Sequence, residues 1–236
     1  MMRAVLAILV SILATAALAA EERILFDVRL GSIKAGELQI AASEGGGRYA
    51  LKGRMQSTGL VAAIRKVRYD ASTRGRLSRG RYVPSEYSEV TNSGRKEESA
   101  VMAYRGGVPQ VKQYSPPREP GPHDVDPSTQ GGSLDPLTAL YAVFRAVPEA
   151  EACATGFRTF DGKRVAQFET SKTSASADEI VCTGVYRRIA GYDPEELSER
   201  QQFPMTMVYR PAGNGLWHVS QMELQTLYGK ARMIRK

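Results

Sequence analysis

Residues 135–145 read DPLTALYAVFR, a helical pattern in a chain whose other apolar residues mostly alternate. Its apolar side chains recur at intervals of three and four residues, which places them on one face of an α-helix. These side chains are Leu137, Leu140, Tyr141 and Phe144. Asp135 can cap the first turn, and Pro136 suits the first helical position because its missing N–H has no partner there. We predict a helix over about 136–146, ended by Pro148.

On both sides of this segment, apolar and polar residues alternate over short stretches, which is typical of half-buried β-strands. The predicted strands are Ile24–Leu30, Tyr49–Met55, Lys66–Thr73, Arg81–Val90, Ser99–Tyr104, Val108–Tyr114, Gly156–Phe160, Arg164–Thr170, Ile180–Arg187, Phe203–Tyr209, Trp217–Leu224 and Leu227–Ile234. Asp161-Gly162 predicts a type I′ hairpin turn, in which both central residues have positive φ.

Two other segments depart from the alternation. A weaker helical pattern spans Gly59–Arg65, with Leu60, Val61 and Ile64 on one face. Residues 115–134 are rich in proline and glycine, and their length predicts a surface loop that leads into the main helix.

These elements predict a mainly β protein. We expect one long, curved antiparallel sheet of roughly ten or more strands, which forms an incomplete barrel wrapped on one α-helix. The 236 residues, 42% of them hydrophobic, suffice for one sizeable core, so a single β-rich domain over 20–236 is expected. The composition excludes a disordered chain, and two cysteines are too few for a disulfide scaffold.

Residues 1–19 have the pattern of a cleaved signal peptide. Arg3 precedes an apolar run over Ala4–Leu13, and Ala17–Ala19 supplies the small residues that signal peptidase recognises. The run is shorter than the ~20 residues that span a bilayer, and no later run approaches that length. We therefore expect export to a bacterial periplasm and no transmembrane span after cleavage.

Cys153 and Cys182 are the only cysteines in the sequence. In an oxidising compartment such a pair usually forms a disulfide, and closing this loop would stabilise the fold by ~3 kcal/mol in the chain-entropy model. A metal site or a catalytic thiol is the alternative, although no further Cys or His lies nearby at ligand spacing.

The formal net charge of +7 is concentrated in one stretch. Residues 65–81 contain one acid, Asp70, and seven basic residues. The basic residues are Arg65, Lys66, Arg68, Arg74, Arg76, Arg79 and Arg81. On a strand, Lys66, Arg68 and Arg74 would share the outer face.

A cationic patch on an exported protein suits lipopolysaccharide phosphate, anionic phospholipid headgroups or peptidoglycan carboxylates. Nucleic acid is the usual partner of such a patch, but the compartment argues against it. The alternative is a solvated edge, where basic side chains discourage aggregation between sheets.

Motifs for catalysis or cofactor binding are not found. The sequence lacks a zinc-protease motif, a nucleophile elbow, a phosphate loop and a dinucleotide fingerprint, so we expect no cofactor and no enzymatic activity. A hydrolase built from scattered residues around His123 or His218 is an alternative. Residues 123–126 (HDVD), with Asp135, could hold a cation, but a solvated acidic loop is the preferred interpretation and no metal site is predicted.

An interior ligand cavity is a further candidate site. Aromatic and methionine side chains on the helix and the late strands could line it, because methionine adapts to irregular apolar ligands. The candidates are Tyr141, Phe144, Met205, Met207, Trp217 and Met222. Ordinary core packing is the alternative role for this set.

Three stretches resemble the signature segments of a family, the domain-of-unknown-function family 3108. They are Asp135–Tyr141 (DPLTALY), Phe160–Arg164 (FDGKR) and Cys182–Tyr192 (CTGVYRRIAGY). The resemblance implies an exported proteobacterial protein with a β-rich, incomplete-barrel architecture similar to periplasmic lipoprotein carriers. It supplies no catalytic residue.

Together these observations favour a soluble, non-enzymatic periplasmic protein that binds an anionic or lipidic component of the cell envelope. The alternative is a carrier that holds an acyl chain or a lipoprotein within the curved sheet.

Overall fold

The computed structural model describes residues 20–236, so the predicted signal peptide at 1–19 lies outside the described residues. The described chain forms fourteen strands, three α-helices and two short 3-10 turns. The strands are β1 (Ala20–Leu30), β2 (Ile33–Gly45), β3 (Arg48–Ser57), β4 (Arg68–Ser78), β5 (Arg81–Asn92), β6 (Glu97–Arg105), β7 (Val108–Ser115), β8 (Val147–Pro148), β9 (Gly156–Phe160), β10 (Val165–Ala175), β11 (Ile180–Ala190), β12 (Gln202–Gly213), β13 (Leu216–Thr226) and β14 (Gly229–Arg235). The helices are α1 (Gly59–Ile64), α2 (Pro136–Phe144) and α3 (Pro194–Glu199), and the 3-10 turns are η1 (Pro127–Thr129) and η2 (Glu149–Glu151).

The strands form one antiparallel sheet in the order β7-β6-β5-β4-β3-β2-β1-β14-β13-β12-β11-β10-β9, and β8 pairs with β13. Strands β1–β7 follow one another along the first half, and β9–β14 along the second. The two halves join where β1 pairs with β14, for example Val28 opposite Met233. The sheet is therefore two meanders with a junction between segments far apart in the sequence.

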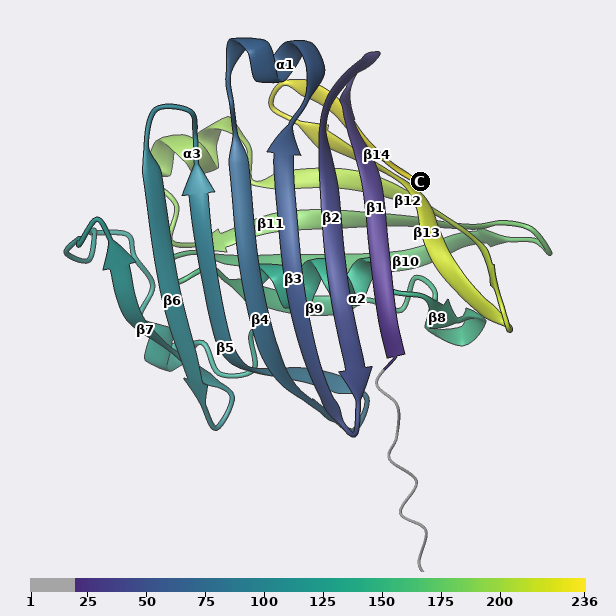
Figure 1. The fold of residues 1–236 in the computed structure, drawn as a ribbon, viewed down its shortest axis with the longest axis horizontal. Helices are drawn as coiled ribbons and strands as arrows, with labels where there is room; N and C mark the ends of the chain where they lie inside the picture. The colour runs from purple at the N-terminus through teal and green to yellow at the C-terminus, as the bar shows by residue number, and fades with distance from the viewer. Residues whose placement is uncertain (1–19) are drawn as a thin grey trace, which may run out of the picture.

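The sheet folds over on itself, so that strands β1–β6 lie in front of strands β9–β13 and cross them steeply (Figure 1). Helix α2 lies between these two layers, and it packs on β3, β4 and β5 of the first half and on β9 and β13 of the second. This arrangement is the predicted mainly β, incomplete barrel wrapped on one α-helix.

Helix α2 is held in the interior by a polar network at its first turn. The Asp135 carboxylate accepts hydrogen bonds from the Thr138 amide at 2.8 Å and from the Thr73 hydroxyl of β4 at 2.9 Å. The hydroxyls of Thr138 and Tyr49 are 3.1 Å apart. Asp135 is fully buried, so the cap predicted from the sequence also fixes the helix to the sheet. The helix ends at Phe144, and Pro148 lies beyond it in β8.

The gap between the edge strands β7 and β9 is crossed by the proline-rich loop, residues 116–135. The Val125 amide donates to the Lys163 carbonyl at 2.9 Å, and the Gly132 amide donates to the Gly107 carbonyl at 2.9 Å. Leu134 forms an isolated parallel bridge with Thr159 of β9. The loop therefore connects both edges of the open sheet.

Several local predictions differ from the structure. Strand β2 is absent from the predicted set, because its buried positions include the small residues Ala35 and Ala42 as well as Leu38 and Ile40. Helix α3 is also missed. The type I′ turn at Asp161-Gly162 is wrong: of its two central residues only Gly162 has positive φ, and the connection spans residues 161–164.

The predicted disulfide is present. Cys153 and Cys182 are bonded, with their Cα atoms 5.5 Å apart. The bond joins the segment after η2 to strand β11, and both residues are buried in the core.

Candidate functional site

A cavity of about 470 Å³ lies beside α2, between the two layers of the sheet. Helix α2 forms one wall, and inward-facing side chains of both halves form the others. Its lining residues are Leu38, Met55, Tyr69, Glu89, Pro136, Ala139, Leu140, Val143, Phe144, Phe157, Thr159, Asp161, Arg164, Ala166, Phe168, Tyr186, Tyr192, Met222 and Met233. Most of this surface is apolar, which is typical of small-molecule sites of ~300–1,000 Å³.

The apolar wall follows from strand register. Leu38 of β2 lies opposite Met55 of β3, and Met55 lies opposite Tyr69 of β4, so the three form a row across the inner face. Phe157 and Phe168 lie opposite each other on β9 and β10, with ring centroids 5.4 Å apart. The alternation that buries one face of each strand therefore also supplies the cavity wall.

The first polar group in the cavity is Glu89 on β5. The Tyr87 hydroxyl donates to its carboxylate, and the hydroxyls of Tyr87 and Tyr69 are 2.7 Å apart. Burial raises the pKa of Glu89, and the hydrogen bond from Tyr87 opposes only part of that rise. The cavity thus contains a carboxyl group that holds its proton more tightly than an exposed glutamate.

The second carboxyl group, Asp161, reaches the cavity from the other half of the sheet. It sits in the turn between β9 and β10, where it accepts from the amides of Lys163 at 3.0 Å and Arg164 at 2.7 Å. Burial raises its pKa, and these hydrogen bonds act in the opposite direction. The charge of Asp161 also raises the pKa of Glu89, so two carboxyl groups face the same end of the cavity.

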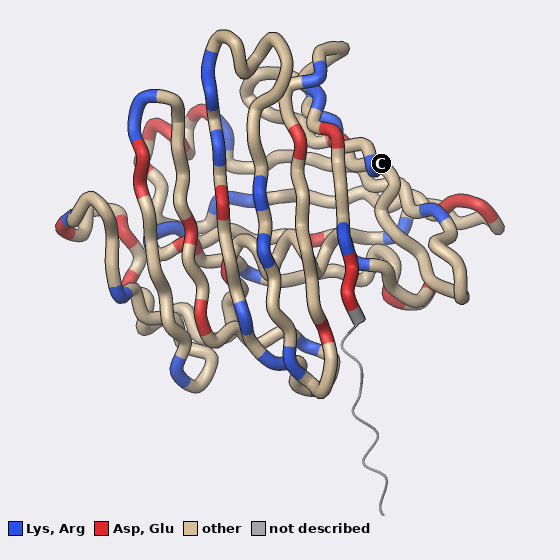
Figure 2. Tube along the Cα trace, in the orientation of Figure 1, with Lys and Arg blue, Asp and Glu red and all other residues tan. Residues whose placement is uncertain are grey.

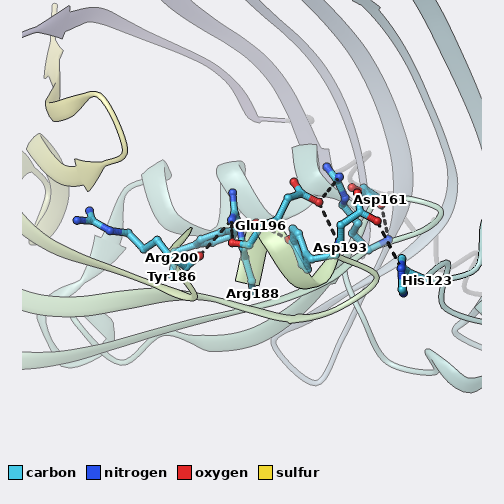
Figure 3. Close-up of polar contacts among 9 residues, drawn as sticks. His123, Asp161, Tyr186, Arg188, Asp193, Glu196 and Arg200 are labelled. Atoms are coloured by element: carbon cyan, nitrogen blue, oxygen red, sulfur yellow. Dashed lines mark hydrogen bonds and ion pairs between the residues drawn. The ribbon is translucent and has the colours of Figure 1, made fainter. Parts of the chain in front are cut away.

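Helix α3 covers this polar end through arginine and tyrosine contacts (Figure 3). Arg164 pairs with Glu196 at 2.8 Å, and Arg188 donates to the Glu196 carbonyl and to the Arg200 carbonyl. The guanidinium groups of Arg164 and Arg188 lie 5.0 and 5.2 Å from the centre of the Tyr192 ring. Tyr192 is therefore fixed as a wall of the cavity.

Gly191 allows this close packing. Its φ is +87°, and a Cβ atom there would lie 2.3 Å from the Lys163 carbonyl oxygen. Only glycine fits both conditions. The resemblance stretches Phe160–Arg164 and Cys182–Tyr192 thus meet at one end of the cavity, and the third, Asp135–Tyr141, forms the first turns of α2.

The predicted cavity residues fall into two groups. Phe144 and Met222 line the cavity. The remaining four, Tyr141, Met205, Met207 and Trp217, are buried elsewhere in the core. The alternation in the sequence did not identify the lining residues Tyr69, Glu89 and Tyr186. It shows that a residue faces inward, but not which inward row borders the cavity.

The predicted basic stretch is a row along the sheet rather than a compact patch (Figure 2). Arg68 and Arg74 lie on the outer face of β4, where they pair with Asp70 and Glu86. Lys66 precedes the strand. The other members are Arg65 before the strand, Arg76 near its end, and Arg79 and Arg81 in and after the β4–β5 turn.

The acidic loop around His123 makes structural contacts. Asp124 pairs with Arg118 at 2.6 Å, and Asp126 accepts from the Ser128 amide at 2.8 Å. His123 lies 3.6 Å from Asp193, which caps α3. Among residues 20–236, no group of three His, Cys, Asp or Glu side chains is arranged to hold a metal ion.

These features define a class: an open, barrel-like antiparallel sheet that encloses a helix and an apolar cavity. The family model described as "Protein of unknown function (DUF3108)" matches residues 25–233, and the chain belongs to this family. The resemblance noted in the sequence is thereby confirmed.

Comparison with solved structures finds a similar chain, a beta-barrel-like protein of domain of unknown function DUF1849 from Brucella abortus. The two are 14% identical, the match covers 94% of this chain and 98% of that one, and the TM-score is 0.49. No curated protein matches the sequence. Within residues 20–236, none of the helices has the length and apolar character needed to cross a membrane.

Proposed function

We propose that this protein is an exported, single-domain binding protein of the bacterial periplasm that holds the apolar chain of an envelope lipid or lipoprotein in the cavity beside α2. The cavity carries this proposal, because it joins an apolar body to a polar end. Phe144, Phe168 and Met222 belong to the apolar body, and Glu89 and Asp161 belong to the polar end. An amphipathic ligand would fit both parts, with its apolar chain in the apolar body and its head group at the polar end.

The proposed role is binding without catalysis. Within the described chain, the residues that line the cavity include no histidine, serine or cysteine. Cys153 and Cys182 are joined to each other, so neither is a free thiol. The carboxyl groups of Glu89 and Asp161 serve in this proposal as hydrogen-bonding partners for the ligand's polar head.

Two observations support the proposed export. The sequence of residues 1–19 has the signal-peptide pattern described above, and the Cys153–Cys182 disulfide suits an oxidising compartment. A fusion of residues 1–40 to a reporter that is active only after export tests this part. An inactive reporter in a bacterial host would contradict it.

The cavity proposal is tested by native mass spectrometry of protein purified from cells without detergent. We expect a mass above that of the chain alone, and release of a lipid on extraction with organic solvent. A clean mass of the unliganded chain, together with no uptake of a fatty acid offered in vitro, would overturn the proposal.

A further inference from the structure

Apolar side chains protrude from one end of the molecule. In α1, Leu60 is 75% exposed and Ile64 is 88% exposed, and the helix has no buried residue. Tyr228, in the turn between β13 and β14, is 89% exposed. The predicted apolar face of the 59–65 helix therefore points away from the core. Clustered exposure of large apolar side chains marks an interaction surface.

These segments are neighbours in space. The Thr58 amide, which precedes α1, donates to the Ala35 carbonyl of β2 at 3.0 Å. The Gly31 amide, in the β1–β2 turn, donates to the Lys230 carbonyl just after Tyr228 at 3.2 Å. In Figure 1, α1 and the β13–β14 turn lie at the same end of the sheet.

Basic side chains surround the apolar ones. Arg65 and Lys66 directly follow α1, and Arg65 donates to the Ser93 carbonyl at 2.6 Å, which brings the β5–β6 turn and its Arg95 to this end. Arg29 lies at the end of β1. Among the described residues, none of these four basic side chains forms an ion pair within 4.0 Å.

Two of the acids close to this end already have ion-pair partners. Glu98 pairs with Lys96 at 2.8 Å, and Glu223 pairs with Lys230 at 2.8 Å. Glu97, the first residue of β6, accepts a hydrogen bond from Asn92 and forms no ion pair among the described residues. Four basic side chains against this one acid leave the unpaired charge at this end net positive, and Figure 2 shows basic positions on α1's flank and on the neighbouring turn. We refer to Leu60, Ile64, Tyr228, Arg29, Arg65, Lys66 and Arg95 as the tip.

We propose that the tip docks on the surface of an anionic phospholipid bilayer. Leu60, Ile64 and Tyr228 enter the interface between headgroups and acyl chains, where apolar and amphipathic aromatic side chains are favoured. The basic side chains contact lipid phosphates, and each such charge near an anionic surface strengthens binding about fivefold. The charge complementarity selects a lipid surface over an uncharged or cationic partner.

The tip also lies at the end where the cavity wall reaches the surface. Met55 lines the cavity, is 41% exposed and precedes α1 by four residues. Docking would therefore bring the cavity close to the bilayer. The docking proposal goes beyond the ligand-binding function and stands even if the cavity holds no lipid.

The test is flotation of the full chain with vesicles of phosphatidylcholine alone or mixed with phosphatidylglycerol. Two double variants alter the tip: Leu60→Ser with Ile64→Ser, and Arg65→Gln with Lys66→Gln. Matched controls are Leu25→Ser with Val101→Ser, which are 39% and 38% exposed, and Arg48→Gln with Arg105→Gln. Arg48 begins β3 and Arg105 ends β6, so the second control removes the same charge at the end of these strands away from the tip.

We expect binding to the anionic vesicles only, weakened by salt, because exposed charges are screened. Each tip variant should lose roughly tenfold or more in affinity, and each control should change little. Equal binding by tip variants and controls, or no binding to anionic vesicles, would overturn the proposal. A dimer in solution that is abolished by Leu60→Ser with Ile64→Ser would also overturn the proposal, because a second copy of the chain would then cover the tip.

Discussion

Thr73 of β4 donates a hydrogen bond to Asp135, the residue that begins α2, at 2.9 Å and across 62 positions of sequence. Both side chains are buried, so the helix is anchored to the sheet by a polar contact inside the core. A buried carboxylate is costly to desolvate unless its hydrogen-bond partners are in place. The position of the cavity wall therefore depends on this one carboxylate.

The first prediction concerns pH. Burial raises the pKa of Asp135 to about 6, against the opposing hydrogen bonds from Thr138 and Thr73, while its ordinary value is 3.8. Between these values the folded state binds more protons than the unfolded state, so this group's contribution to the free energy of unfolding falls as pH rises from about 4 to about 6. The loss amounts to about 3 kcal/mol.

Asp135→Asn removes the titration and keeps an acceptor for the Thr138 amide. Urea unfolding at pH 4 to 7 should therefore show wild type losing stability relative to the variant as pH rises. Asp126→Asn is the contrast, because hydrogen bonds from Ser128 lower the pKa of Asp126 and its contribution rises with pH instead. Parallel pH profiles of the free energy of unfolding for wild type and Asp135→Asn would show that the pKa of Asp135 is not raised in the folded state.

The second prediction concerns the disulfide. Replacing Cys153 and Cys182 together by serine should lower the free energy of unfolding by ~2–5 kcal/mol, because the loop of 29 positions between them is no longer closed in the unfolded chain. Denaturant unfolding measures the change. Wild type in reductant should approach the variant, and identical unfolding with and without reductant would show that the bond contributes nothing.

The third prediction concerns the cavity. Ala139→Phe places a ring on the cavity face of α2, where it competes for the volume that an acyl chain would occupy. We expect at least a tenfold loss of fatty-acid affinity, measured by displacement of a fluorescent fatty acid. Ala50→Phe makes the same change on the exposed outer face of β3 and should bind like wild type. Equal affinities for both variants would place the ligand elsewhere.

The fourth prediction concerns α3. Arg188→Met removes the hydrogen bonds to the carbonyls of Glu196 and Arg200. Amide exchange over residues 194–199 should quicken at least fivefold, since each lost hydrogen bond of about 1 kcal/mol lowers the local opening free energy. Arg210→Met, which removes the ion pair between Arg210 on β12 and Glu179 in the β10–β11 turn, is the control. Unchanged exchange over α3 would mean that Arg188 does not hold it.

The elements with strong local signals could be predicted, but most of the residues that line the cavity could not. Asp135 and Pro136 mark the start of α2 because capping is a short-range effect. The capping box of Asp193 and Glu196 would have revealed α3 in the same way, since its spacing is visible in the sequence. The meeting of Glu89 with Asp161 depends on how the two halves of the sheet cross, and no local pattern encodes that.

The pairing of β1 with β14 has a consequence for how the fold is reached. Each half of the sheet can form from neighbouring strands as hairpins, but their junction pairs Phe26 with Arg235, near opposite ends of the described chain. Contacts of such long sequence separation slow folding, because loop closure must precede their formation. In the proposed export, a chain that is still being translocated would keep two unpaired edges, β1 and β13, until β14 arrives. Those edges are where a folding helper or a misassembled second copy would bind first.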